Sequence, residues 1–282
     1  MRVGNLSNRL TLFTELGAID VEQSSGGLFA ADPQAVYDRW DEFIAWVASP
    51  RSVTQAVPYA TESLGPPAPR PRQVFAIGAN YRAHLEEADF PVPEWPMIFT
   101  KWPSSFAGPF GEIVIPTDSV DWEAELVAIV GRRARNVTAE RGWNYIAGLT
   151  VGQDVTERPI QVRGVMPQFS QSKSFPGFSP SGPWLVTLDE FTDPGDLEIS
   201  CILNGRVVQK ARTSDLIFTV PMIVAELSKT LTLEPGDVIF TGTPGGVGYN
   251  HKPPIYLAAG DKLVTTIERI GEMRHSIVSP RS

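Results

Sequence analysis

The stretch Asp121-Trp122-Glu123-Ala124-Glu125-Leu126-Val127-Ala128-Ile129-Val130-Gly131 is the most informative part of this 282-residue chain. Acidic and apolar residues alternate over its first half, and an uninterrupted apolar run follows. Successive side chains of a β-strand point to opposite faces, so a strand here places Asp121, Glu123 and Glu125 on one face. The apolar run predicts that this strand continues into a core. Three carboxylates repel one another unless a cation lies among them. The pattern therefore indicates either a site for a hard metal ion or a strand edge whose acids face water.

Composition and length indicate a globular protein, since 42% hydrophobic residues over 282 positions suffice for a substantial core. Acidic residues outnumber basic ones by 32 to 24, and no run of Lys and Arg could neutralise phosphates, so nucleic acid is not an expected partner. A single cysteine, Cys201, fits a reducing compartment, and we expect a cytoplasmic protein. No apolar stretch has the length of a signal peptide or a membrane span, so neither secretion nor a membrane partner is expected.

We expect two parts: a small N-terminal domain with a proline-rich linker over residues 1–72, and a main body over residues 73–282. The N-terminal part starts with strand-like segments at 2–6 and 9–13 and continues with an amphipathic helix at 33–48, whose apolar residues recur with a 3.6-residue period. The segment Gly65-Pro66-Pro67-Ala68-Pro69-Arg70-Pro71 cannot continue a helix or a central strand, and it marks the boundary.

The main body is predicted to be rich in short strands. These are expected at 74–77, 97–100, 113–115, 122–130, 146–151, 184–188, 197–203, 206–209, 238–241 and 262–267. Asn204-Gly205 predicts a tight hairpin, because both central positions of a type I′ turn need positive φ. One clear helix is predicted at 219–229. With 25 prolines and 24 glycines, a mixed, β-rich α+β fold is favoured over a doubly wound α/β sheet.

A further carboxylate, Asp154, follows a predicted strand at the start of a polar loop. Oxygen ligands without a cluster of His or Cys indicate Mg²⁺ or Mn²⁺ rather than Zn²⁺ or copper. Three carboxylates would leave about three of the six positions of Mg²⁺ for water and substrate oxygens. Asp is also a common turn residue, so a structural role for Asp154 stays open.

His84 and Glu87 lie in a segment that could form a short helix, where residues three apart share a face. A carboxylate behind an imidazole fixes its tautomer and raises its basicity, which suits a base that takes a proton from water. The alternative is that His84 is an ordinary surface histidine.

Several polar residues near strand ends could contact a substrate. The glycine-rich segment 241–248 lacks the Gly-Lys-Ser/Thr of a nucleotide-binding P-loop, but it could present backbone N–H groups and the Thr243 hydroxyl to an oxygen-rich ligand, or form a structural turn. Lys173 could stabilise a developing anion, although a solvated lysine is the alternative. Arg158 and Gln161 could hold a substrate carboxylate or carbonyl.

The order and spacing of these motifs over residues 73–278 resemble the fumarylacetoacetate hydrolase family, in particular an acylpyruvase-like member. The resemblance rests on eight ordered motifs: Gly78-x-Asn80-Tyr81-x-x-His84-x-x-Glu87, Asp121-Trp122-Glu123-Ala124-Glu125-Leu126, Asp154-Val155-Thr156-x-Arg158-x-x-Gln161, Ser172-Lys173-Ser174-Phe175, Asn204-Gly205, Pro235-Gly236-Asp237, Thr241-Gly242-Thr243-Pro244 and Gly260-Asp261.

The resemblance implies a β-roll core in a homodimer, with Mg²⁺ or Mn²⁺ bound by Glu123, Glu125 and Asp154. It implies that Asp121 is not a direct ligand, and that His84 and Glu87 form a water-activating pair on a segment that closes as a lid. The positions matching Lys173, Arg158, Gln161 and Thr243 lie near the substrate in the family.

The resemblance also implies an enzyme that acts on a small oxo acid. The main expectation is metal-dependent hydrolysis of a C–C bond in a 1,3-diketo acid of the acylpyruvate or fumarylpyruvate type. The alternatives are oxaloacetate decarboxylation, 2-oxo acid tautomerisation or isomerisation on the same metal site, and, from another class, a non-catalytic scaffold or binding protein. The chain departs from the family pattern at Pro159 and Pro176, where acidic residues are common, and both changes bear on substrate choice.

Overall fold

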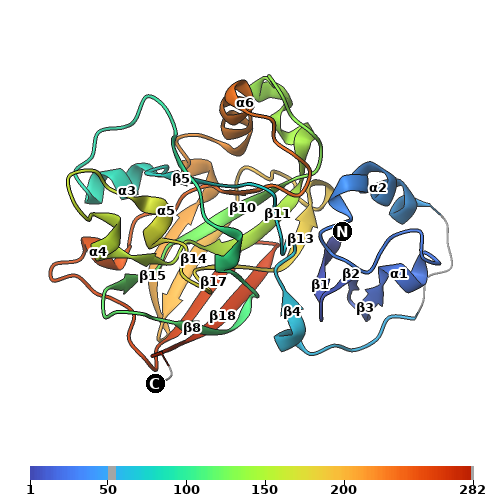
Figure 1. Ribbon diagram of the computed structural model, residues 1–282, viewed down its shortest axis with the longest axis horizontal. Helices are drawn as coiled ribbons and strands as arrows, with labels where there is room; N and C mark the ends of the chain where they lie inside the picture. The colour runs from blue at the N-terminus through green and yellow to red at the C-terminus, as the bar shows by residue number, and fades with distance from the viewer. Residues whose placement is uncertain (50–54, 281–282) are drawn as a thin grey trace.

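The computed structural model describes residues 1–49 and 55–280, which form two large β-sheets and a small two-stranded one, with short helices around them (Figure 1). The larger sheet runs in the order β3-β2-β1-β13-β11-β10-β16-β5-β6. In that order its strands are Gly17–Asp20, Arg9–Thr14, Arg2–Leu6, Ser179–Thr187, Ile146–Gln153, Ala124–Val130, Val238–Phe240, Val74–Gly78 and Met97–Phe99. Two short strands lie off this path: β4 (Leu64–Gly65) pairs with β1, and β7 (Phe106–Ala107) pairs with β13.

The second sheet has the order β15-β14-β17-β18-β8 and carries the predicted hairpin. Its strands in that order are Arg206–Arg212, Glu198–Leu203, Lys262–Ile267, Gly271–Val278 and Phe110–Val114. Asn204 and Gly205 join β14 to β15 with φ of 51° and 80°, as the two-residue turn requires. The mixed, sheet-rich α+β fold expected from the sequence is confirmed.

The helices of the described residues are mostly short: α1 (Val21–Ser24), α2 (Trp40–Ala48), α3 (Arg82–Glu87), α4 (Arg158–Gln161), α5 (Phe169–Ser172) and α6 (Val220–Thr230). In Figure 1, α3, α4 and α5 lie on one side of the molecule, far from the N-terminal strands. The predicted helix at 33–48 is wrong for its first part. Arg39 has φ −129° and ψ 32°, so the regular helix begins only at Trp40, after a 3₁₀ turn at Tyr37–Arg39.

The N-terminal strands extend the large sheet, because β1 pairs antiparallel with β13 through Arg2↔Val186 and Val3↔Leu185. In Figure 1 they form, with α1 and α2, the blue part at one end of the molecule. The division of the chain at residue 72 stays a prediction.

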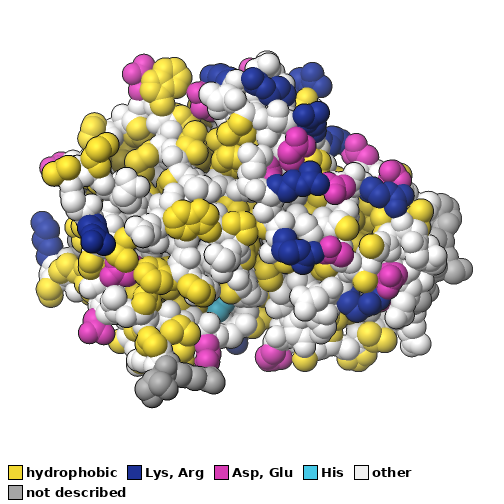
Figure 2. All heavy atoms as spheres, viewed as in Figure 1, with side chains coloured by type: hydrophobic (Ala, Val, Ile, Leu, Met, Phe, Trp, Pro, Cys, Tyr) yellow, Lys and Arg dark blue, Asp and Glu magenta, His cyan; other side chains and the backbone are white. Residues whose placement is uncertain are grey.

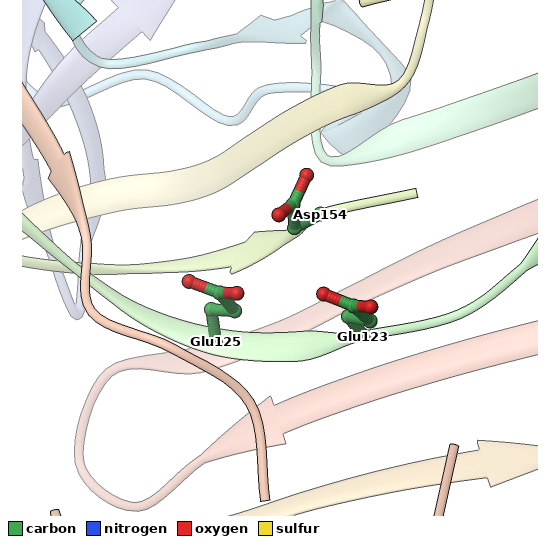
Figure 3. Close-up of side chains that lie close together, drawn as sticks. All are labelled: Glu123, Glu125 and Asp154. Carbon is green, nitrogen blue, oxygen red and sulfur yellow. The ribbon is translucent and has the colours of Figure 1, made fainter. Parts of the chain in front are cut away.

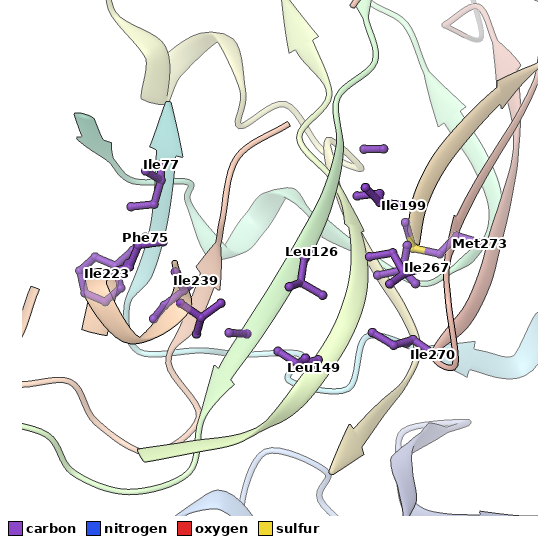
Figure 4. Packing of buried hydrophobic residues seen from close by; sticks show 14 of the residues in the cluster. Phe75, Ile77, Leu126, Leu149, Ile199, Ile223, Ile239, Ile267, Ile270 and Met273 are labelled. Atoms are coloured by element: carbon purple, nitrogen blue, oxygen red, sulfur yellow. The ribbon is translucent and has the colours of Figure 1, made fainter. Parts of the chain in front are cut away.

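The core occupies the faces of both sheets. One cluster of buried side chains joins them and draws on strands and helices far apart in the chain, among them Phe75, Leu126, Ile199, Ile223 and Met273 (Figure 4). Each of these side chains is less than 8% exposed. The strand β10, Ala124–Val130, contains most of the predicted apolar run 127–131 and is buried over its whole length, as expected for a central strand.

The acidic stretch does not form one continuous strand, so the predicted strand at 122–130 is wrong at its start. Asp121 belongs to β9 (Val120–Asp121), which pairs with β12 (Thr156–Glu157), whereas β10 begins at Ala124 in the large sheet. Trp122 and Glu123 lie between the two strands. The side chain of Gln153 replaces a ladder partner there, because its Oε1 accepts from the Glu123 N–H at 2.9 Å. Asp121 thus belongs to the small sheet, and the carboxylates that lie together are those of Glu123, Glu125 and Asp154.

Candidate active site and metal centre

Glu123, Glu125 and Asp154 meet at the edge where β10 and β11 pair. The register Ala124↔Gln153 places the start of β10 opposite the end of β11, so Asp154 faces the two glutamates (Figure 3). Their carboxylate oxygens lie within 4.8 Å of one another, and all three residues are buried. The structure thus brings together the three residues predicted as metal ligands.

Three buried cations surround these acids. Nζ of Lys173 lies 2.7 Å from Glu123 Oε2 and 2.8 Å from Asp154 Oδ2, while Nη1 of Arg158 lies 2.8 Å from Glu123 Oε1. Lys101 pairs with Asp154 Oδ1 and also donates to the carbonyls of Lys173 and Phe178 at 2.6 and 3.1 Å. Lys101 is fully buried, and no sequence motif predicted a role for it.

The surroundings shift the pKa values of Glu123 and Glu125 in opposite directions. Burial alone would raise the pKa of Glu123, but the charges of Lys173 and Arg158 outweigh it and hold that pKa at about 2. Burial raises the pKa of Glu125 well above its usual value, and the negative charges of Asp154 and Glu123 raise it further. Among the described residues, no basic side chain forms an ion pair with Glu125; its Oε2 accepts from the Gly242 N–H at 2.8 Å. Glu125 is therefore the acid whose charge lacks compensation.

The donor set fits a divalent cation. Asp154 Oδ2 is buried and accepts no well-directed hydrogen bond from the residues that the structure describes, although Lys173 lies 2.8 Å away. Glu125 lacks a cation of its own, and all the available ligand atoms are carboxylate oxygens, which Mg²⁺ and Mn²⁺ prefer. These residues could hold either ion, and their assignment as ligands stays a prediction.

Asp121 binds the surrounding chain instead of joining the acidic cluster. Its Oδ2 accepts from Arg158 Nε and Nη2 at 2.8 and 2.6 Å and from the Tyr249 N–H at 2.9 Å. Its Oδ1 accepts from the N–H groups of Trp122 and Gly248, both at 2.8 Å. Arg158 also donates from Nη1 to Gln161 Oε1 at 2.9 Å. Asp121 thus orients Arg158 toward Glu123.

The predicted His–Glu pair forms on α3. His84 Nδ1 and Glu87 Oε1 are 2.9 Å apart, and both side chains are partly exposed. Burial opposes ionisation of Glu87, but hydrogen bonds from His84, the Gly246 N–H and Asn250 lower its pKa. With Nδ1 bound to the carboxylate, Nε2 is the nitrogen of His84 that can exchange a proton with a substrate.

The glycine-rich segment 241–248 binds carboxylates of the protein itself. The N–H groups of Gly242, Gly246 and Gly248 donate to Glu125, Glu87 and Asp121 respectively, each at 2.8 Å. Thr243 is buried, and its Oγ1 accepts from Gln209 Nε2 at 2.8 Å. Gln209 Oε1 accepts from the Ala124 N–H at 3.0 Å, so one buried glutamine ties Thr243 to the start of β10.

Sequence patterns gave no sign of Lys101, Gln153 or Gln209. All three are buried polar residues, and buried polar groups are rare unless they have a specific partner. Gln153 ends an otherwise mostly apolar strand and Lys101 precedes Trp102, whereas Gln209 lies among charged residues of β15. An isolated polar residue in such a setting was the available signal. Pro159 lies in the first turn of α4, where its missing N–H costs no hydrogen bond.

Fold and site together define an enzyme family. The family description "fumarylacetoacetate (FAA) hydrolase C-terminal" matches residues 73–278, and the chain belongs to this family. Human oxaloacetate tautomerase FAHD2A, a mitochondrial protein, is 42% identical over 214 residues, which span 75% of this chain and 68% of the human one.

Solved structures show the same likeness over the full length. A structure from Mycobacterium smegmatis, provisionally described as an HpcE protein, is 47% identical with a TM-score of 0.96 and covers 100% of both chains. Maleylpyruvate hydrolase from Sphingobium sp. SYK-6, in complex with manganese(II) and pyruvate, is 29% identical with a TM-score of 0.81 and also covers 100% of both chains.

The surface and the helices add two observations. On the face drawn in Figure 2, several Lys and Arg side chains lie beside Asp and Glu rather than in one basic patch. Arg132 and Asp41, for example, form an exposed ion pair at 2.7 Å. None of the helices in residues 1–49 and 55–280 has the length and apolar character that a membrane crossing needs.

Proposed function

We propose that this protein is a divalent-metal-dependent tautomerase of small dicarboxylic 2-oxo acids of the oxaloacetate type. The observation that carries the proposal is the buried group Glu123, Glu125 and Asp154 together with a separate His84–Glu87 pair. A likeness of 42% to a human oxaloacetate tautomerase favours keto–enol conversion over the other reactions considered.

The reaction moves one proton within the substrate. His84, oriented by Glu87, takes a proton from C3 of the keto form, and the proton returns to the oxygen on C2 to give the enol; the reverse sequence gives the keto form. No water is consumed and no bond between heavy atoms breaks. Mg²⁺ or Mn²⁺ held by Glu123, Glu125 and Asp154 would supply Lewis-acid stabilisation of the charge that develops on the substrate oxygens.

The buried cations suit an anionic substrate. The site contains four carboxylates and three basic side chains: Asp121, Glu123, Glu125 and Asp154 with Lys101, Lys173 and Arg158. By formal charge, a divalent cation would leave the site net positive. We assign Lys173 to the developing enolate and Thr243 to a substrate oxygen. Gln161 Oε1 already accepts from Arg158, which leaves its NH₂ group for a substrate carboxylate.

C–C hydrolysis of an acylpyruvate, the main expectation from the sequence, is the second candidate. It needs His84 to activate a water molecule, and the likeness to maleylpyruvate hydrolase favours it. Identity to the human oxaloacetate tautomerase is 42%, against 29% to maleylpyruvate hydrolase, and this difference favours the tautomerase proposal. A homodimer and a cytoplasmic location stay predictions from the sequence.

Product analysis separates the reactions. Purified protein with Mn²⁺ would be incubated with oxaloacetate and with a panel of acylpyruvates in ²H₂O, and the products would be identified by mass. We expect fast deuterium exchange at C3 of oxaloacetate without CO₂ release or carboxylic acid fragments. Cleavage of acylpyruvates without C3 exchange of oxaloacetate would replace this proposal by the hydrolase, and CO₂ release would replace it by decarboxylation.

A further inference from the structure

Residues 246–250, which we call the strap, connect the two halves of the site. Two of its donors bind Glu87: the Gly246 N–H at 2.8 Å to Oε2 and Asn250 Nδ2 at 2.9 Å to Oε1. The two donors between them in the chain, the N–H groups of Gly248 and Tyr249, bind Asp121 at 2.8 and 2.9 Å. The five-residue strap thus binds two carboxylates: Glu87, which contacts His84, and Asp121, which contacts Arg158.

The strap can follow this path only with glycine at two positions. Gly246 has a φ of 99°, and a Cβ there would lie 2.0 Å from the Val208 carbonyl oxygen. A Cβ on Gly248 would lie 1.9 Å from the Ile255 carbonyl oxygen and 2.8 Å from Asp121 Oδ1. The close packing fixes the strap against β15 and against the segment around Ile255, so the donors it offers to Glu87 have a fixed position.

The side chain of Asn250 is the part of the strap that bears directly on the proton-transferring pair. Glu87 Oε1 accepts from Asn250 and also lies 2.9 Å from His84 Nδ1, so both groups meet at one oxygen. Asn250 therefore limits the rotation of the Glu87 carboxylate and, through it, of the imidazole ring. Without Asn250, Glu87 would keep His84, which lies on the same helix, and one donor of the strap, the Gly246 N–H. The Glu87–His84 pair could then turn about the Gly246 hydrogen bond.

We propose that Asn250 is a positioning residue of the reaction: anchored through the strap to Asp121, it sets Glu87 and hence the ring of His84 relative to the acidic cluster. This inference rests on the proposed role of His84 and Glu87. It also assigns Asp121 the role of the anchor that keeps the strap, Arg158 and Glu123 in one arrangement.

The test compares wild type with Asn250→Ala and Asn250→Asp, with Lys252→Ala, an exposed residue of the same loop, as the control. We expect kcat for keto–enol conversion to fall about tenfold in Asn250→Ala with KM within about twofold, because a hydrogen bond to a charged group is lost. Asn250→Asp has the same shape but adds a negative charge beside Glu87, and it should lower kcat further. Mn²⁺ affinity should not change in either variant.

Two readouts separate positioning from a general loss of structure. Amide hydrogen exchange of α3 should accelerate in Asn250→Ala, while exchange of 124–130 stays as in wild type. Asn250→Ala should also have no further effect on kcat in a Glu87→Gln background, since it acts through Glu87.

Unchanged kcat in Asn250→Ala would overturn the inference. The same holds if Asn250→Ala lowers kcat by the same factor in wild type and in the Glu87→Gln variant. If wild type converts no oxo acid, the proposed function fails, and the exchange of α3 alone decides whether the strap holds that helix.

Discussion

Nζ of Lys173 lies 2.7 Å from Oε2 of Glu123, and both side chains are buried. Burial lowers the pKa of Lys173, but the negative charges of Asp154 and Glu123 outweigh it and raise that pKa above its usual value. The ammonium therefore stays charged inside the protein and compensates two of the acids that are predicted to bind metal.

Replacing Lys173 by Met should lower both stability and activity. In the presence of a chelator, we expect the free energy of unfolding to fall by about 3–5 kcal/mol, because Glu123 and Asp154 lose a buried partner. Catalysis should fall about 10²–10³-fold with loss of the positioned cation. Urea denaturation and the oxaloacetate assay measure the two effects.

The matched control is Lys210→Met, which removes an exposed ion pair with Glu198 at 3.1 Å. Exposed pairs contribute about 1 kcal/mol or less. Equal stability and activity of the two variants would contradict the role given to Lys173.

Glu125→Gln should have opposite effects on the metal-free and the metal-loaded protein. Burial and the neighbouring acids raise the pKa of Glu125, so a neutral amide relieves repulsion and should stabilise the metal-free protein by about 1 kcal/mol. The same change removes a metal ligand, so saturating Mn²⁺ should raise the melting temperature much less than in wild type.

Differential scanning fluorimetry with and without Mn²⁺ measures both effects, with Glu86→Gln, an exposed residue of α3, as the control. A Mn²⁺-induced rise as large in Glu125→Gln as in wild type would exclude Glu125 as a ligand.

His275 should make the protein less stable in acid. It lies on β18, where Nε2 bonds to the Gly108 carbonyl at 3.1 Å. Nδ1 is buried and has no hydrogen-bond partner among residues 1–49 and 55–280. Burial lowers its pKa from 6.5 to about 4. The unfolded chain therefore binds a proton first, and the stability contribution is lost as the pH falls from about 6.5 to about 4, by about 3 kcal/mol in all.

Urea denaturation of wild type and His275→Gln over this pH range tests the assignment. The variant should show a flatter dependence of stability on pH than wild type, whatever its absolute stability. Identical slopes would assign the acid sensitivity to other groups.

Gly248→Ala should disrupt the strap, because the added Cβ would lie 1.9 Å from the Ile255 carbonyl oxygen and 2.8 Å from Asp121 Oδ1. We expect a loss of about 1–3 kcal/mol, typical of overpacking, together with lower activity. Gly195→Ala, where the Cβ would meet only the Asp193 side chain at 3.2 Å, should be close to neutral. Equal melting temperatures of the two variants would show that the strap tolerates a side chain.

The sequence predicted much of the fold because strand periodicity and turn chemistry are local signals. Asn204-Gly205 specified its hairpin, and the apolar run after Glu125 specified a central strand. The strand Gly271–Val278 was not predicted, although Met273, His275 and Ile277 alternate on its buried face. A histidine at a core position and charged neighbours concealed this alternation.

The site residues were predictable where motifs far apart in the chain could be combined. They were not predictable where contacts of the folded chain determine which side chains meet. Local alternation grouped Asp121 with Glu123 and Glu125. In the structure a break separates their strands, and there the Glu123 N–H bonds to the side chain of Gln153, thirty positions further on. Lys101 was not predicted, because only the folded chain places Asp154 beside it.

The most direct test of the central claim is the rate at which enol oxaloacetate becomes the keto form, followed by loss of enol absorbance in a weakly catalytic buffer. We predict that chelator-treated protein leaves the spontaneous rate unchanged and that added Mn²⁺ restores fast conversion in wild type. Mn²⁺ should not restore it in His84→Ala. Fast conversion by the chelator-treated protein, or none by the Mn²⁺-loaded protein, would contradict the account.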